Sequence, residues 1–231
     1  ESFAQGGGVA AARAADAFGV DHMLSSVTKP DMETVAAAVS EPTLFQLYVR
    51  GDADFIDAHV TRAVDAGFRA FCITVDTAHY SRRERDIIKR YLPAGRARGA
   101  RSTGHHWQMA FNWDNVKRFK DRHDVPLILK GIATAEDAAI AVEHGVDGVY
   151  VSNHGGRQLD FGRGSVDVLP EVVEAVDGKA EIAVDGGFCR GTDIVKAMLL
   201  GANAVGIGRM QGYALAAGGE PGLLCLSGGS F

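Results

Sequence analysis

Short apolar runs recur along the whole chain, and longer amphipathic stretches separate them. The runs are HMLSSV, LFQLYV, AFCITV, LILKG, GVYVSN, EIAVDG and AVGIGR, at 22–27, 44–49, 70–75, 127–131, 148–153, 181–186 and 204–209. Runs of this length are typical of strands, and their nearly continuous apolar character favours a parallel sheet that is buried on both faces. We therefore predict seven parallel strands.

The stretches between the runs have the spacing and the end signals of helices. They read METVAAAV, DFIDAHVTRAVDAG, TAEDAAIAVEHG and GTDIVKAMLLG, at 32–39, 54–67, 134–145 and 191–201. Thr134 is a typical first cap, and Gly67, Gly145 and Gly201 are typical helix ends. Strands that alternate with helices in this way predict an α/β protein built from βα units.

Polar residues stand at the carboxyl end of every apolar run. They are Ser25, Gln46, Tyr48, Thr74, Asp76, Lys130, Ser152, His154, Asp185, Gly208 and Arg209. A (β/α)8 TIM barrel brings all its strand ends to one mouth, whereas a doubly wound sheet concentrates its site at one switch point. The pattern favours the barrel, as a single domain over residues 1–231. Seven strands are one short of closure, so we expect the first strand to precede residue 1.

One long stretch, residues 91–113, has no clear periodicity, and we predict a mobile loop there. The composition is that of an ordinary globular protein, with 46% apolar and 23% charged residues. A formal net charge of −5 does not favour binding to nucleic acid. No apolar run approaches the length of a transmembrane segment. The three cysteines lack metal-site spacing, which predicts reduced thiols in a cytoplasmic protein and no metal.

Two glycine loops near the end of the chain indicate a phosphate site. DGGFCRGTD, at 185–193, follows a strand and opens a helix, so the amides around Gly186 and Gly187 and the helix N-terminus can receive an anion. The next strand ends in Gly208 and Arg209, and Arg190 follows the first pair of glycines. Adjacent glycine loops after the last two strands are the usual phosphate cradle of a barrel. The alternative is a pair of tight turns with solvated arginines.

The stretch VSNHGGRQLD, at 151–160, places His154 and Arg157 three residues apart after a strand. A histidine there can accept a proton near neutral pH, and a guanidinium matches a carboxylate with two hydrogen bonds. Asp76 could orient the histidine, and Arg83 could add a second cation. Lys130 could place a fixed positive charge against a developing anion. The alternative for each is a structural or solvated side chain.

Several of these elements together resemble one family. SNHGGRQLD, FQLYV, TVDT followed by RRERD, LILKGI, and DGGFCRGTDIVKAMLLGANAVGIGR resemble the FMN-dependent α-hydroxy-acid oxidases and dehydrogenases. That family includes glycolate oxidase, lactate oxidase, mandelate dehydrogenase and the flavin domain of flavocytochrome b2. The resemblance runs from about residue 5 to about residue 223, and the SNHG-x-RQ element is highly specific to the family.

The resemblance implies roles for the matching positions. It implies that His154 is the base that acts on the substrate and that Asp76 is the partner of this histidine. It also implies that Arg157 binds the substrate carboxylate and that Tyr48 and Arg83 contact the substrate. The residues that it implies bind FMN are Ser25, Gln46, Thr74, Lys130, Ser152, Asp185, Gly187, Gly208 and Arg209. The glycine-loop pattern adds Gly186 and Arg190 to this set.

The implied activity is oxidation of an L-2-hydroxy acid to the 2-oxo acid, with oxygen or another carrier as the electron acceptor. The family also implies a homo-oligomer, a tetramer or larger. This chain departs from the pattern at Cys189, where the family has an arginine, and at LLCLSGGSF, which replaces the expected C-terminal tail. Two alternatives stay open: another flavin- or phosphate-binding barrel enzyme such as an isomerase, and a non-catalytic, incomplete barrel.

Overall fold

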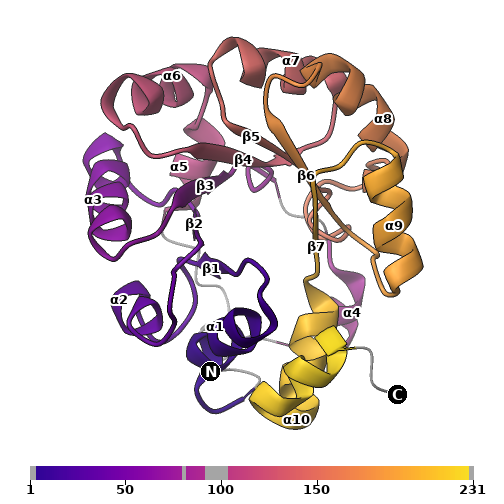
Figure 1. Ribbon diagram of the computed structural model, residues 1–231. Helices are drawn as coiled ribbons and strands as arrows, with labels where there is room; N and C mark the ends of the chain where they lie inside the picture. Colours follow the sequence, from indigo (N-terminus) through magenta and orange to yellow (C-terminus); the bar gives the residue numbers. More distant parts are fainter. Residues whose placement is uncertain (1–3, 80–81, 92–103, 229–231) are drawn as a thin grey trace.

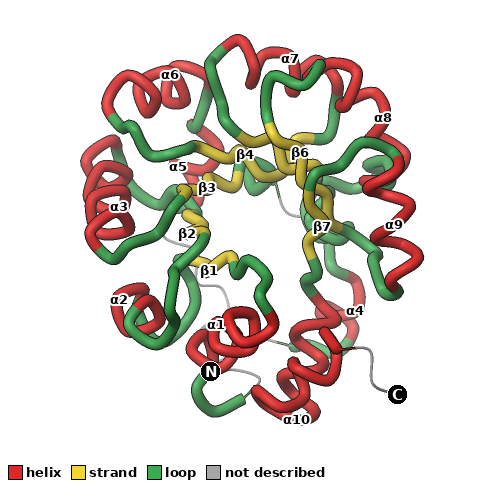
Figure 2. The backbone as a smooth tube through the Cα atoms, viewed as in Figure 1, coloured by secondary structure: helices red, strands yellow, loops and turns green. Residues whose placement is uncertain are grey.

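The computed structural model describes residues 4–79, 82–91 and 104–228 of the chain. These residues form one parallel sheet that curls into an arc, with helices around its outside (Figures 1 and 2). The strands are β1 Met23–Ser25, β2 Leu44–Leu47, β3 Ala70–Thr74, β4 Leu127–Ile132, β5 Gly148–Val151, β6 Glu181–Asp185 and β7 Ala204–Gly206. Six lie inside the predicted apolar runs, and β4 extends one residue beyond its run, to Ile132, so the seven strands are confirmed.

The strands pair in chain order from β1 to β7, and each neighbouring pair is parallel. This order belongs to a barrel and not to a doubly wound sheet, in which the order reverses at a switch point. Within the described ranges β1 and β7 do not pair with each other, so the sheet is an open arc of a barrel. A strand before residue 1 stays a prediction. All carboxyl ends lie along one rim, which gathers the polar residues predicted there.

The helices are α1 Gly7–Phe18, α2 Met32–Ala36, α3 Ala53–Asp65, α4 Glu84–Ile88, α5 His105–Ala110, α6 Trp113–Arg122, α7 Ala135–Glu143, α8 Ser165–Val176, α9 Gly191–Leu199 and α10 Arg209–Gly228. The predicted end signals act as expected. The Thr134 hydroxyl accepts the Asp137 amide at 3.2 Å. Gly67, Gly145 and Gly201 have φ of 89°, 70° and 103°, the left-handed region that favours glycine.

The stretch at 91–113 differs in part from the predicted loop. Residues 92–103 lie outside the described part of the chain. Most of the rest is helical: α5 occupies His105–Ala110, and α6 begins at Trp113. Asn112 explains the start of α6, because its side chain accepts the Asn115 amide while the Asn115 side chain accepts the Asn112 amide. This reciprocal cap was overlooked in the sequence.

The core lies between the sheet and the helices. Phe45, Phe71 and Phe119 are each 2% exposed or less. The ring centroid of Phe71 lies 5.7 Å from that of Phe45 and 5.6 Å from that of Phe119. Such close packing fixes the strands, and thereby the direction of the side chains that leave their carboxyl ends. A smaller cluster joins α1 to α10 through Ala11, Ala14 and Leu215. Of the described helices, none combines the length and the apolar character that crossing a bilayer requires.

Candidate functional site

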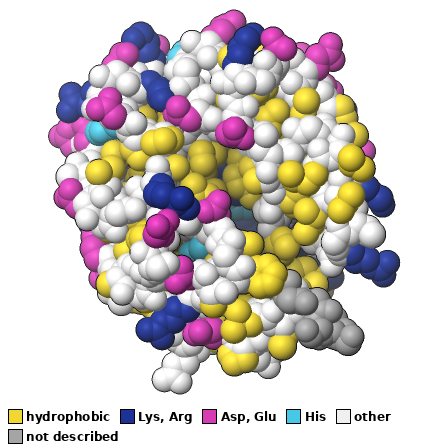
Figure 3. Space-filling model, viewed as in Figure 1, with side chains coloured by type: hydrophobic (Ala, Val, Ile, Leu, Met, Phe, Trp, Pro, Cys, Tyr) yellow, Lys and Arg dark blue, Asp and Glu magenta, His cyan; other side chains and the backbone are white. Residues whose placement is uncertain are grey.

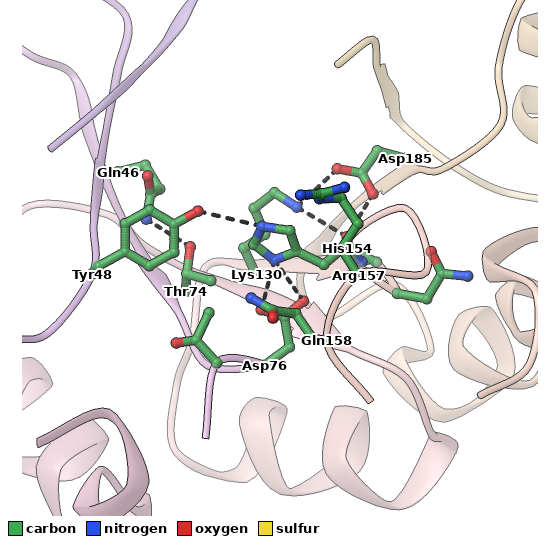
Figure 4. A network of polar contacts seen from close by, with 12 residues as sticks. Gln46, Tyr48, Thr74, Asp76, Lys130, His154, Arg157, Gln158 and Asp185 are labelled. Carbon is green, nitrogen blue, oxygen red and sulfur yellow. Dashed lines mark hydrogen bonds and ion pairs between the residues drawn. The ribbon is translucent and has the colours of Figure 1, made fainter. Parts of the chain in front are cut away.

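A histidine between a carboxylate and a phenol lies at the centre of the rim (Figure 4). His154, just after β5, has Nδ1 at 3.0 and 3.1 Å from the two carboxylate oxygens of Asp76, just after β3. Its Nε2 lies 3.4 Å from the hydroxyl of Tyr48, after β2. The carboxylate favours the tautomer with the proton on Nδ1, which leaves the Nε2 lone pair facing Tyr48. The histidine is thereby oriented as a proton acceptor.

The backbone around this pair is specialised. His154 itself has φ of 55°, a left-handed conformation that non-glycine residues adopt at a cost and that is common at functional sites. Its amide donates to the Ser152 hydroxyl at 3.0 Å. On the other side, Gly131 has φ of 109°, and a Cβ there would stand 2.6 Å from Cβ of Asp76. Glycine at 131 therefore leaves the room that Asp76 needs.

Lys130 belongs to a second polar group on the neighbouring strand ends. Its Nζ donates to a carboxylate oxygen of Asp185 at 2.8 Å and to the Ser152 hydroxyl at 2.9 Å. The same hydroxyl donates to the other Asp185 oxygen at 2.5 Å. The Lys130 and Asp185 side chains are only 14% and 19% exposed. A positive charge is thus held in a fixed place at the rim, where it can oppose a developing negative charge.

A third polar group connects β1, β2 and β3. The Ser25 hydroxyl donates to the amide oxygen of Gln46 at 2.6 Å, and the amide nitrogen of Gln46 donates to the Thr74 hydroxyl at 2.7 Å. Gln46 and Thr74 are each 4% exposed. Buried polar side chains that are linked in this way hold one orientation, which suits recognition of the polar edge of a flat ring.

The two predicted substrate arginines lie beside the histidine loop. Arg83 donates to the carbonyl oxygen of Arg157 at 3.3 Å and to the Gln158 amide oxygen at 3.4 Å. Arg157 directs its guanidinium at Asp86 of α4, at a long 3.6 Å, with 43% of its side chain exposed. Arg83 therefore braces the loop, and the half-exposed Arg157 is the more available cation.

The two glycine loops lie at the ends of β6 and β7. Gly186 and Gly187 have φ of 106° and 88°, and a Cβ on Gly187 or Gly208 would meet open space. Arg209 donates to the carbonyl oxygen of Gly155 at 3.2 Å, which brings the β7 end against the β5 loop.

Arg190 is exposed at the start of α9. Its amide and that of Cys189 donate to the Asp193 carboxylate, at 3.0 and 3.1 Å. The structure does not place Arg190 or Cys189 against the His154 pair.

The donor set fits a flavin mononucleotide. Uncharged hydroxyl and amide groups of Ser25, Gln46 and Thr74 suit the polar edge of the ring, and Lys130 supplies a cation beside them. Two open glycine turns and Arg209 suit the phosphate. Figure 3 shows the molecule hollowed at the middle of the ring, with apolar side chains around the depression. In the described ranges no group of three His, Cys, Asp or Glu side chains is placed to hold a metal ion.

Two residues of the site were not predicted from the sequence. Gln158 is 3% exposed and meets Arg83; its place inside the SNHGGRQ motif was the signal that could have found it. Tyr150 lies inside the arc below Lys130, whose Nζ is 4.5 Å from its ring centroid. The sequence pattern counted Tyr150 only as part of an apolar strand. The nearby Cys72 is fully buried, and burial raises the pKa of its thiol to about 12, so this thiol is inert.

A cavity of about 610 Å³ lies away from these residues, between α1, α2 and the starts of β1 and β2. His22 and Thr43 line it, and burial lowers the pKa of His22 to about 4. None of the polar groups described above lines this cavity, so we place the site at the rim, on the chemistry of its side chains.

Comparison with known proteins finds relatives of this chain among proteins of known activity. L-lactate oxidase of Nostoc sp. is 41% identical over 94% of this chain and 66% of that protein. Glycolate oxidase of Spinacia oleracea is 39% identical over 94% of this chain and 64% of that protein. The crystal structure of mandelate oxidase superposes with a TM-score of 0.88 at 38% identity, over 98% of this chain and 67% of that chain. Mandelate oxidase with (S)-2-phenylpropionate superposes with a TM-score of 0.88 at 39% identity, over 98% of this chain and 66% of that chain.

The chain spans just under two thirds of the length of these curated relatives, 66% and 64%. The family model described as FMN-dependent dehydrogenase matches residues 1–226, almost the whole chain. Because this match extends over every strand of the arc and every residue of the rim, the chain belongs to the FMN-dependent dehydrogenase family.

Proposed function

We propose that this chain forms the FMN-binding barrel of an enzyme that oxidises an L-2-hydroxy acid to the 2-oxo acid. The observation that carries the proposal is the His154 ring, held by Asp76 on one nitrogen and facing Tyr48 with the other. This is the arrangement of a general base that is oriented by a carboxylate.

His154 accepts a proton from the substrate at Nε2. The imidazolium that forms then has the Asp76 carboxylate as its counter-ion at 3.0 Å. Tyr48 lies on the accepting side of the ring, 3.4 Å from Nε2, where its hydroxyl can bond to the reacting oxygen of the substrate. A base and a hydrogen-bonding group on the same side hold the substrate close to the geometry of reaction.

Arg157 binds the substrate carboxylate. Its present partner, Asp86, is 3.6 Å away and both side chains are more than a third exposed, so this contact is weak and easily exchanged. A bidentate bond from guanidinium to carboxylate is stronger. Arg83 holds the Arg157 carbonyl and so keeps the loop in place while the guanidinium turns.

FMN supplies the redox chemistry: when bound, it takes the electron pair and the second hydrogen that the 2-hydroxy acid loses. We assign its ring to Ser25, Gln46, Thr74, Lys130 and Ser152, and its chain and phosphate to Asp185, Gly186, Gly187, Gly208 and Arg209, with Arg190 as an outer cation. The final acceptor is oxygen or another carrier. A cytoplasmic location and a homo-oligomer of four or more copies remain part of the proposal.

The test is an absorption spectrum of the purified protein before and after lactate, glycolate or mandelate is added without oxygen. We expect a yellow protein that one of these acids bleaches. His154→Gln removes the base and leaves the FMN contacts, so it stays yellow and is bleached at least about 100-fold more slowly. His144→Gln is the matched control, because that histidine bonds to the Ile140 carbonyl of its own helix, far from the rim.

Three outcomes contradict the proposal in different ways. A yellow protein that no 2-hydroxy acid bleaches points to a flavin enzyme with another reaction, such as an isomerase. A colourless protein with no affinity for FMN points to a non-catalytic barrel. Unchanged bleaching in His154→Gln removes that histidine from its role.

A further inference from the structure

Tyr150 is a buried phenol whose ring lies under the Lys130 ammonium. It stands in β5, is 8% exposed, and has the Lys130 Nζ 4.5 Å from its ring centroid. The Asp185 carboxylate of β6 lies close enough to this phenol for its negative charge to act on the hydroxyl. The Lys130 cation therefore has three partners: the Asp185 carboxylate at 2.8 Å, the Ser152 hydroxyl at 2.9 Å, and an aromatic face.

The same phenol reaches one strand further, to β7. A Cβ placed on Gly206 would stand 1.7 Å from the Tyr150 hydroxyl oxygen and 3.0 Å from the ring carbon that carries it. Gly206 is not among the glycines with positive φ, so its backbone does not demand glycine. The glycine is required by the space that the phenol fills. Tyr150 thus spans β5, β6 and β7 beneath the rim.

The phenol affects the charges of Lys130 and Asp185 as well as the packing against Gly206. Burial, and then the negative charge of Asp185, raise the pKa of Tyr150 far above its ordinary value. The group therefore stays neutral. A neutral hydroxyl beside Asp185 adds no charge to the site, and its dipole screens part of the carboxylate charge that faces Lys130.

We infer that Tyr150 is a positioning residue that fixes the Lys130 ammonium and the Asp185 carboxylate at the mouth and so tunes the reduction potential of bound FMN. The inference rests on the proposed function, because the cation acts there on the flavin. Tyr150 does not touch the substrate; it acts through Lys130 and Asp185.

The first experiment needs no flavin. Urea unfolding is measured for Tyr150→Phe, Gly206→Ala and the double variant, as a double-mutant cycle. Gly206→Ala should lower the unfolding midpoint strongly in the native chain and less in the Tyr150→Phe chain, because the clashing oxygen is gone. Additive effects would show that the hydroxyl does not fill the space over Gly206, and would overturn the inference.

The second experiment measures the midpoint potential of the bound flavin. Without the phenol dipole, the negative charge of Asp185 acts on the flavin with less screening, so Tyr150→Phe should lower the potential. We expect a roughly tenfold weaker preference for the reduced form, which is about 30 mV for a two-electron couple. Lys130→Met should lower the potential further. Tyr213→Phe, at a tyrosine that is 66% exposed on α10, is the matched control and should change nothing.

The outcomes separate the two proposals. An unchanged potential in Tyr150→Phe, with a lowered potential in Lys130→Met, overturns the role of Tyr150 and leaves the proposed function intact. A native chain that takes up no FMN refutes the proposed function instead. In that case the stability cycle still decides whether Tyr150 spans the strands as inferred.

Discussion

Gly131 links the fold to the histidine pair, and replacing it with alanine tests that link. Gly131 lies in β4 between Lys130 and Ile132, where the pairing with β5 shifts by one residue. Its φ is 109°, and an alanine Cβ would stand 2.6 Å from Cβ, 2.7 Å from Cγ and 3.0 Å from the amide nitrogen of Asp76. Two penalties therefore combine, one from the backbone and one from the clash.

The backbone penalty for a non-glycine residue in such a region is about 1–3 kcal/mol. Gly19→Ala separates the two terms, because Gly19 has φ of 78° and a Cβ there would meet nothing within 4 Å. We expect Gly131→Ala to lower the free energy of unfolding by about 1–2 kcal/mol more than Gly19→Ala does, which is an ordinary cost of overpacking.

The clash also has a functional consequence. Asp76 must move to make room, and its bonds to His154 at 3.0 and 3.1 Å lengthen. A misplaced base costs on the order of 100-fold when the shift approaches 1 Å, so we expect anaerobic bleaching to slow by roughly 10-fold or more. Urea unfolding and stopped-flow bleaching measure the two effects. If Gly131→Ala matched Gly19→Ala in both, Gly131 would not control the position of Asp76.

Two further predictions concern stability. The pKa of His22 falls from 6.5 to about 4 on folding, so the unfolded chain takes up a proton that the folded chain excludes. The free energy of unfolding should therefore drop as pH falls from 6.5 to 4, by at most about 3 kcal/mol. Urea unfolding measured over this pH range should show a smaller drop for His22→Gln than for the native chain. An equally large drop in both would contradict the prediction. Arg118→Met removes two bonds to Asp57, at 2.9 and 2.6 Å, and should lower the free energy of unfolding by about 1–2 kcal/mol. Lys117→Met breaks an exposed ion pair within one helix and should lower it by less than about 0.5 kcal/mol. Equal unfolding midpoints for these two variants would refute the distinction.

The strands and most helix ends could be predicted because their signals are local. Thr134 caps the helix that follows it, and Gly145 ends the helix that precedes it. Residues close in the sequence are therefore enough to predict where the helix begins and ends. The order of the strands followed from polar residues at every strand end. The pairing of His154 with Asp76 could be proposed for the same reason, since both follow strands that end at one rim.

Other features depend on distant contacts that no local pattern reports. The hydroxyl of Tyr150 lies near Asp185 of β6 and Gly206 of β7, and its residue type alone predicted only a buried strand position. Arg83 and Arg157 were both predicted to contact the substrate, which stays a prediction, and the bond from Arg83 to the Arg157 carbonyl was not predicted. Which of two neighbouring arginines braces a loop depends on the backbone path between them, and the sequence does not record that path.

The polar group of Ser25, Gln46 and Thr74 holds the Gln46 carboxamide in one plane. Its oxygen accepts from Ser25 and its nitrogen donates to Thr74, and because both partners are hydroxyls, a carboxamide rotated by half a turn could bond to both with the directions reversed. Within the described contacts, one oxygen lone pair and one N–H of the carboxamide remain for a ligand. A group that can present either a donor or an acceptor suits the edge of an imide, which has both N–H and C=O, and disfavours a purely hydrocarbon edge, which would leave both groups of Gln46 unpaired.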